Sequence, residues 1–181
     1  MAKSEESASD REIISGSGME AADVIHLLKL FEQHEIAVVV DGGWGVDALL
    51  GHWTRPHEDL DIAIEHKDVP KLRNLLARIG YKELPQPDSS DFNFVIGNTR
   101  GQKVDVHSYT FDADGKAVYG IPYPAESLTG TGTIENYVVR CISADWVVKF
   151  HTQYEPDDND FKDVHAVCAK FGIGLPPMYV R

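Results

Sequence analysis

Positively charged residues are scarce in this chain of 181 residues, which has 17 Lys and Arg against 29 Asp and Glu. The formal net charge of −12 at pH 7 predicts an acidic surface, which repels nucleic acid and anionic membranes. A nucleic-acid partner is therefore not expected. A cationic small molecule would be favoured over an anionic one.

Long apolar runs are also missing, and cysteines are few. No apolar run approaches the roughly 20 residues that a membrane-spanning helix needs. Residues 1–18 contain no apolar stretch of the signal-peptide type, and their small, polar and charged composition predicts a disordered lead-in. Two cysteines, Cys141 and Cys168, cannot form a disulfide framework, and their apolar surroundings are typical of buried thiols in a reducing compartment. These absences favour a cytoplasmic protein without a membrane partner.

Apolar periodicity predicts alternating helices and strands. Helices are expected over 19–34, 44–50, 68–79 and 143–154, with a last one around 164–171, and strands over 36–40, 60–64, 92–96, 104–107 and 138–142. The stretch 109–135, rich in Gly, Pro, Tyr and Thr, is expected to be irregular. This order predicts an α/β (α+β) fold with a mixed sheet flanked by helices. Residues 19–142 would form the core, and residues 143–181 a C-terminal helical part of the same unit.

The strongest chemical signal is the pair of carboxylates Asp59 and Asp61 around Leu60. Side chains at i and i+2 of a strand point to the same face, so the two carboxylates would repel each other. A divalent cation between them would remove that repulsion, and magnesium prefers such hard oxygen ligands. The alternative is a solvated strand face without a metal.

A second strand repeats the pattern, because Asp105 and His107 are also two residues apart. Three carboxylates from two neighbouring strands meet the requirement of a two-metal phosphoryl-transfer site. Asp105 is the expected third metal ligand, the base that accepts a proton, or both. His107 is the other candidate base.

A glycine pair, Gly42 and Gly43, follows the strand 36–40 and precedes a helix. Glycines let a phosphate approach the backbone, and the helix N-terminus offers free N–H groups to an anion. Arg55 could bind triphosphate oxygens in a bidentate manner. His57 alternates with Asp59 and so could join this site, and such a string could also hold a transition metal in a hydrolase. Asp47 faces either solvent or the site.

Together these motifs resemble the small antibiotic nucleotidyltransferases of the polymerase β superfamily. The resemblance rests on residues 41–47 (DGGWGVD), 55–61 (RPHEDLD) and 104–107 (VDVH). The chain looks most like the short lincosamide nucleotidyltransferases, and aminoglycoside 2″-nucleotidyltransferases are similar but more distant. Residues 150–154 (FHTQY) resemble a further element of the lincosamide group. The likeness extends over about residues 20–170.

The resemblance implies a polymerase β-like fold, an ATP co-substrate and Mg²⁺, with two ions. It implies a small-molecule acceptor, a cationic antibiotic, and leaves a homodimer open. Asp59, Asp61 and Asp105 would be the metal ligands and catalytic carboxylates. The predicted nucleotide-binding residues are Gly42, Gly43, Arg55, His57 and Lys162, the last from a Lys-Asp pair of related enzymes. In this fold, residues 109–135 would help to wall the acceptor site.

Two other functions are compatible with parts of this pattern. One is a nucleotidyltransferase of the toxin–antitoxin type that modifies a protein or RNA, although the acidic charge disfavours RNA. The other is a non-catalytic binding module, which would not need three converging carboxylates. The identity of the acceptor and of its modified hydroxyl stays open.

Overall fold

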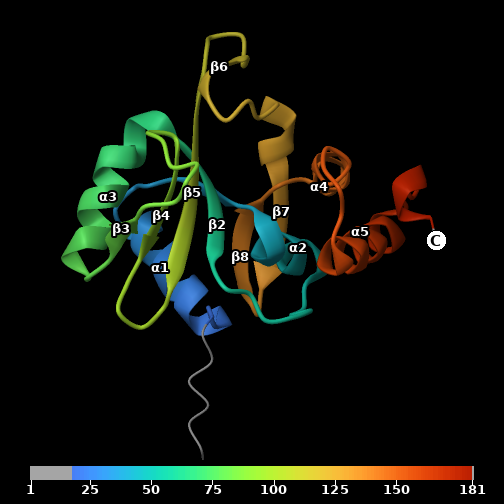
Figure 1. Cartoon of the computed structure of the whole chain (residues 1–181), viewed down its shortest axis with the longest axis horizontal. Coiled ribbons are helices and arrows are strands. Elements are labelled where there is room, and N and C mark those ends of the chain that lie inside the picture. Colours follow the sequence, from blue (N-terminus) through green and yellow to red (C-terminus); the bar gives the residue numbers. More distant parts are fainter. Residues whose placement is uncertain (1–17, 181) are drawn as a thin grey trace, which may run out of the picture.

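The computed structural model describes residues 18–180 and contains one mixed sheet with helices around it (Figure 1). The predicted disordered lead-in, residues 1–18, lies outside the described residues except for Gly18. The helices are α1 (Ala21–Gln33), α2 (Gly42–Leu50), α3 (Val69–Arg78), α4 (Ala144–Phe150) and α5 (Asp158–Phe171), with short 3-10 helices η1 (His66–Asp68), η2 (Ala125–Thr129) and η3 (Pro177–Tyr179). The strands are β1 (Val38–Val40), β2 (Leu60–Glu65), β3 (Lys82–Leu84), β4 (Asn93–Gly97), β5 (Lys103–Phe111), β6 (Ala117–Gly120), β7 (Gly130–Ile134) and β8 (Tyr137–Cys141).

The sheet has the order β3-β4-β5-β2-β1-β8-β7, and β6 pairs with β5 outside this path. β2 and β5 run parallel in an unbroken register from Leu60 opposite Val104 to Glu65 opposite Tyr109. β1 is antiparallel to β2 and meets β8 only where Val40 pairs with Cys141. The mixed sheet flanked by helices confirms the predicted fold class.

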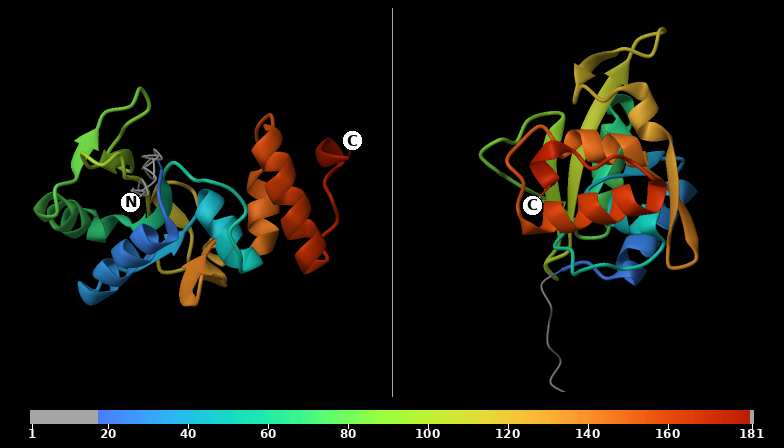
Figure 2. Two further views of the ribbon diagram at one scale, coloured as in Figure 1. Left: turned by 90° about the horizontal axis from the view of Figure 1, so that it is seen from below. Right: turned by 90° about the vertical axis from the view of Figure 1, so that its right-hand side faces the viewer.

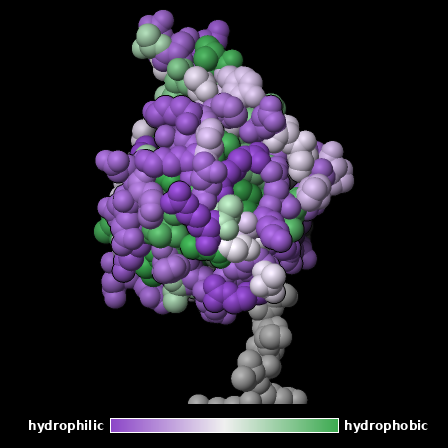
Figure 3. All heavy atoms as spheres, turned by 90° about the vertical axis from the view of Figure 1, so that its left-hand side faces the viewer, coloured by the Kyte–Doolittle hydropathy of each residue, from purple (hydrophilic) through white to green (hydrophobic). Residues whose placement is uncertain are grey.

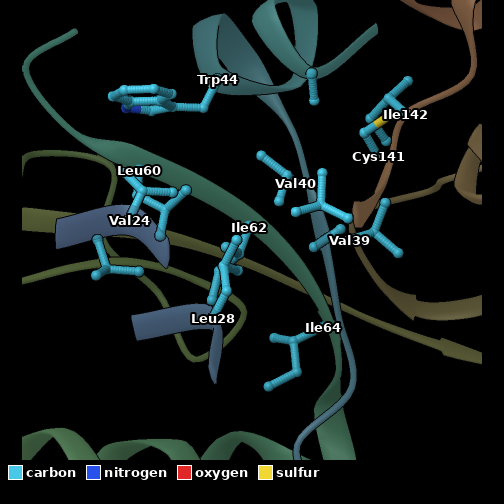
Figure 4. Close-up of a cluster of buried hydrophobic side chains, with 14 of the residues drawn as sticks. Val24, Leu28, Val39, Val40, Trp44, Leu60, Ile62, Ile64, Cys141 and Ile142 are labelled. Atoms are coloured by element: carbon cyan, nitrogen blue, oxygen red, sulfur yellow. The ribbon is translucent and has the colours of Figure 1, made fainter. Parts of the chain in front are cut away.

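The main core lies between α1 and the central strands, as Figure 4 shows. Val24 and Leu28 of α1 point at Leu60 and Ile62 of β2, because apolar residues at helical spacing share one face of α1. These side chains are buried, and the burial of each one stabilises the folded state by roughly 1.5–3 kcal/mol. Every second side chain of β2 is therefore fixed toward the core, which leaves Asp61 on the opposite face.

The C-terminal helices lie at the opposite end of the molecule from α1 and α3 (Figure 2). α4 and α5 contact each other, and both also contact α2. The two cysteines are free and buried, as predicted. No helix among the described residues is long and apolar enough to cross a membrane. The face on the α3 side is mostly hydrophilic, and apolar atoms show mainly in its hollows (Figure 3).

The prediction of an irregular segment over 109–135 was wrong. β5 continues to Phe111, and the stretch also contains β6, η2 and β7. One of its glycines serves close packing: a Cβ atom at Gly132 would lie 2.1 Å from the carbonyl oxygen of Ala48, so β7 packs directly on α2. The strand β3 was not predicted. The helix expected over 143–154 ends earlier, at Phe150.

Candidate active site

Asp61 and Asp105 lie directly opposite each other on the neighbouring parallel strands β2 and β5. Strands in a sheet are about 4.8 Å apart, so the two residues fall well within the span that two metal ions can bridge. Asp59 immediately precedes β2, two residues before Asp61. The prediction that the Asp-bearing strands are neighbours is confirmed.

The carboxylates share a partly buried and electronegative environment. The pKa of Asp61 is raised well above its usual range by desolvation, and further by the charges of Asp59, Asp41 and Asp105. Desolvation also raises the pKa values of Asp59 and Asp105, while Lys103 and His107, respectively, oppose these increases. Ionised carboxylates in such a place disfavour one another unless positive charge is added.

These residues suit a magnesium ion in charge and donor type. Carboxylate oxygens are the ligands that Mg²⁺ prefers, and a cation would relieve the repulsion that raises their pKa values. Within residues 18–180, no three His, Cys, Asp or Glu side chains already stand in a coordinating arrangement. The fold thus brings Asp61 and Asp105 side by side on neighbouring strands.

His107 lies beside Asp105 on β5, with His107 Nε2 3.6 Å from Asp105 Oδ1. Its Nδ1 atom is buried and has no hydrogen-bond partner among the described residues. The two candidate bases therefore lie side by side on β5.

The glycine turn lies against the acidic face. Gly42 is the first residue of α2 rather than part of a preceding loop, and Asp41 caps the helix by accepting from the Gly42 N–H at 2.8 Å. Gly42 has φ = +56°, and a Cβ atom there would lie 2.2 Å from Asp61 Oδ2. Only glycine lets the backbone approach this carboxylate in that conformation.

Tyr123 is a site residue that the sequence did not reveal. Its hydroxyl donates to Asp41 Oδ2 at 2.9 Å, and burial, together with the Asp41 charge, raises the pKa of Tyr123. The residue follows β6 in a segment predicted as irregular, so no periodicity marked it. It connects the 121–124 segment to the cap of α2.

His57 and Asp47 lie beneath the glycine turn. The His57 side chain is 3% exposed, and its Nε2 is 2.6 Å from Asp47 Oδ2. Asp47, expected at the surface or facing the site, is instead buried and also accepts from Thr54 Oγ1 at 2.5 Å. His57 therefore does not share an open face with Asp59 and Asp61, and it has almost no surface on which to contact a nucleotide.

Arg55 and Asp163 form an ion pair, and both residues line a large cleft beside the glycine turn. Arg55 Nη2 donates to Asp163 Oδ2 at 2.9 Å, and the side chains are 25% and 5% exposed. Lys162 is exposed and lies outside the residues that line the cleft. Helix α5 turns Asp163 inward instead, on the stripe of Val164 and Val167. That helical spacing is present in the sequence and predicts the inward direction of Asp163, but it does not reveal the partner Arg55, 108 residues away.

A cleft with a volume of about 660 Å³ joins the acidic face to the C-terminal helices. Its lining includes the glycine turn, Arg55, Asp61 and His107, and residues 121–124 form part of the wall. Aromatic side chains of α4 and the following turn complete it: Trp146, Phe150, His151 and Tyr154. Residues 150–154, the segment that resembles the lincosamide group, thus form part of the cleft wall.

A second, more polar hollow of about 290 Å³ lies on the other side of the carboxylates. Asp59, Lys103 and Asp105 line it together with the 86–95 segment, which adds Asp88 and Asn93. Asp61 thus lines the larger cleft, and Asp59 and Asp105 line this hollow, so the candidate metal ligands border both spaces.

Gly42→Ala is expected to reduce nucleotidyl transfer at least tenfold, because the new methyl group would displace the Asp61 carboxylate. The positive φ alone should cost about 1–2 kcal/mol of stability. Gly80→Ala is the matched control, since Gly80 has φ = +87° and nothing within 4 Å of an added Cβ atom. Kinetics and thermal unfolding of both variants test this. Equal activity in the two would show that the contact with Asp61 does not matter.

Sequence comparison matches most of this chain to known proteins. Residues 23–167 match the family model described as aminoglycoside-2″-adenylyltransferase. A curated lincosamide resistance protein of Staphylococcus haemolyticus is 28% identical over 148 residues, which cover 78% of this chain and 90% of that protein.

Solved structures show the same fold. The lincomycin-bound lincosamide antibiotic adenylyltransferase LnuA aligns with a TM-score of 0.72 at 24% identity, covering 88% of this chain and all of that one. ANT(2″)-Ia in complex with adenylyl-2″-tobramycin aligns with a TM-score of 0.67 at 19% identity, covering 84% and 89%. The predicted resemblance is confirmed by these matches.

Proposed function

Because the chain belongs to the aminoglycoside-2″-adenylyltransferase family, and is thus an adenylyltransferase, we propose that it transfers AMP from ATP to a hydroxyl of a small-molecule antibiotic. A lincosamide is the first candidate acceptor and an aminoglycoside the second. The reaction would require Mg²⁺. The observation that supports this most directly is the register that sets Asp61 opposite Asp105 beside the glycine turn.

Asp59, Asp61 and Asp105 would hold the magnesium ions, which supply charge neutralisation for the triphosphate and activation of the attacking oxygen. The first turn of α2 would bind phosphate oxygens through its free N–H groups, as in other anion sites at helix N-termini. Arg55 would add a guanidinium at the edge of the same cleft.

Asp105 would accept the proton of the acceptor hydroxyl as its oxygen bonds to the α-phosphorus of ATP and pyrophosphate leaves. His107 is the competing base. The larger cleft would bind the nucleotide, since it contains the glycine turn, Arg55 and aromatic side chains suited to stack on a base. The polar hollow would then receive the acceptor, and its carboxylates favour a cationic one. Residues 121–124 would accordingly wall the nucleotide site, and not the acceptor site that was expected for the segment 109–135.

A transfer assay tests this proposal directly. Labelled ATP and Mg²⁺ are incubated with the protein and a panel of lincosamides, aminoglycosides, a substrate protein and tRNA. Label on an antibiotic is expected, and it should disappear when EDTA removes the metal. Label on protein or tRNA alone would instead support the toxin–antitoxin type, and no label on any acceptor would favour a binding module.

Nucleotide binding provides an independent measurement. ATP with Mg²⁺ should raise the melting temperature, because a ligand that binds only the folded state stabilises it by mass action. Asp61→Asn should weaken this shift, since the metal would connect protein and phosphates. The absence of a shift with every nucleoside triphosphate would contradict the proposal.

The buried free thiols are consistent with action in the cytoplasm.

A further inference from the structure

A line of hydrogen bonds connects the segment before β2 to α5. Thr54 Oγ1 and His57 Nε2 both donate to Asp47, at 2.5 and 2.6 Å. On the other side of the imidazole, Arg55 Nη1 lies 3.2 Å from His57 Nδ1, and Arg55 Nη2 donates to Asp163 at 2.9 Å. Both nitrogen termini of the guanidinium are therefore held by protein groups.

The donors and acceptors fix the direction of this line. Arginine has no acceptor, so His57 Nδ1 must accept from Arg55, and its hydrogen must then be on Nε2, where Asp47 accepts it. Each carboxylate oxygen of Asp47 consequently has a donor. The His57 ring has one orientation that satisfies these partners, so it offers Arg55 a fixed acceptor.

The line places the guanidinium beside the first turn of α2. A Cβ atom at Gly43 would lie 2.3 Å from His57 Nδ1 and 3.1 Å from Arg55 Nη2. Arg55 lines the large cleft and is 25% exposed, whereas Asp163 is 5% exposed. Asp163 also lines the cleft but is the more buried of the two residues. One hydrogen on each of Nη1 and Nη2 is left for a ligand, while Nε is buried and has no hydrogen-bond partner among the described residues.

We propose that Asp163 is a positioning residue, which orients Arg55 so that its free N–H groups bind the triphosphate next to Gly43. This inference rests on the proposed nucleotidyl transfer and adds a residue that acts only through Arg55. The planar guanidinium binds two phosphate oxygens at once only in a suitable orientation. Two of its termini are held by Asp163 and His57, so little conformational freedom is lost when a nucleotide binds.

The test compares Asp163→Asn, Arg55→Lys and the double variant with wild type. Asp163→Asn should raise KM for ATP about tenfold, the effect of one lost charge-assisted hydrogen bond, with kcat changed less than about threefold. In the Arg55→Lys background, the same substitution should not raise KM further. Glu83→Gln is the matched control, because it removes a carboxylate from the Arg73–Glu83 ion pair, which lies away from the cleft.

Binding of inorganic tripolyphosphate with Mg²⁺, measured by calorimetry, separates this inference from the proposed function. Asp163→Asn should weaken that binding about tenfold as well. A variant that melts earlier but keeps wild-type KM and tripolyphosphate affinity would overturn the positioning role, as would additive effects in the double variant. If Asp163→Asn does not fold, Asp163→Glu, which displaces the charge by one methylene, replaces it. This variant should show smaller increases in KM for ATP and in the dissociation constant for tripolyphosphate. If the wild type transfers no nucleotide, but the Asp163 variants still bind tripolyphosphate more weakly than the wild type does, only the proposed function is refuted.

Discussion

Asp59→Asn and Asp61→Asn are each expected to abolish nucleotidyl transfer while leaving the fold intact. Each substitution removes a carboxylate that would bind magnesium, and the expected loss is several kcal/mol of transition-state stabilisation. Steady-state turnover at saturating ATP measures it. A variant that keeps more than about a tenth of wild-type turnover would show that the pair does not hold the metal.

The same substitutions should stabilise the metal-free protein near neutral pH. Burial and the neighbouring carboxylates raise the folded-state pKa of Asp61 above its ordinary value of 3.8. The stability contributed by its protonated form is therefore fully present below the ordinary pKa and is lost as the pH rises through the raised one. Asn carries no charge, so thermal unfolding of Asp61→Asn with EDTA should show a higher melting temperature at pH 7 and a weaker pH dependence.

Asp114→Asn serves as the control for both measurements. Asp114 is exposed in the turn between β5 and β6, outside both hollows. Its substitution should change neither turnover nor the melting temperature. An equal rise in melting temperature for Asp114→Asn would attribute the effect to the net charge of −12 rather than to the site.

Asp105→Asn is expected to lose catalysis while nucleotide binding is largely kept. Asp105 lies opposite Asp61 and lines the polar hollow, where it could take the proton of the acceptor. His107→Ala should lose less, because Asp105, whose Oδ1 lies 3.6 Å from His107 Nε2, would still be present to accept the proton. Single-turnover rates together with the ATP-induced melting shift distinguish the two. If His107→Ala were the more damaging variant, the histidine would be the base.

Alternation of apolar residues with small or polar ones predicted β2 and β5 and the shared face of their carboxylates. This succeeded because a strand with a core on one side leaves one period-two pattern, which residues 104–107 follow throughout and residues 60–64 follow except at the buried Ala63. The expectation that these two strands are neighbours in the sheet followed from their matching patterns.

The network below the glycine turn could not be predicted in this way. His57 falls in alternation with Asp59, but it precedes β2 and turns toward α2, where Asp47 provides a buried acceptor. Such pairing depends on how two elements pack, which one-dimensional periodicity does not contain. Tyr123 and Asp163 were missed for the same reason, because each meets its partner across a long sequence separation.

The Arg55–Asp163 ion pair joins positions that are 108 residues apart, which has a consequence for the order of folding. The strands β2 and β5 can bring the carboxylates together before α5 exists, whereas Arg55 obtains its second partner only when the end of the chain has docked. Contacts of such separation form late, since the chain entropy they cost must be offset by earlier ones. A growing polypeptide would thus acquire its acidic centre first and its aligned arginine last, so binding of polyphosphate can report the completion of folding.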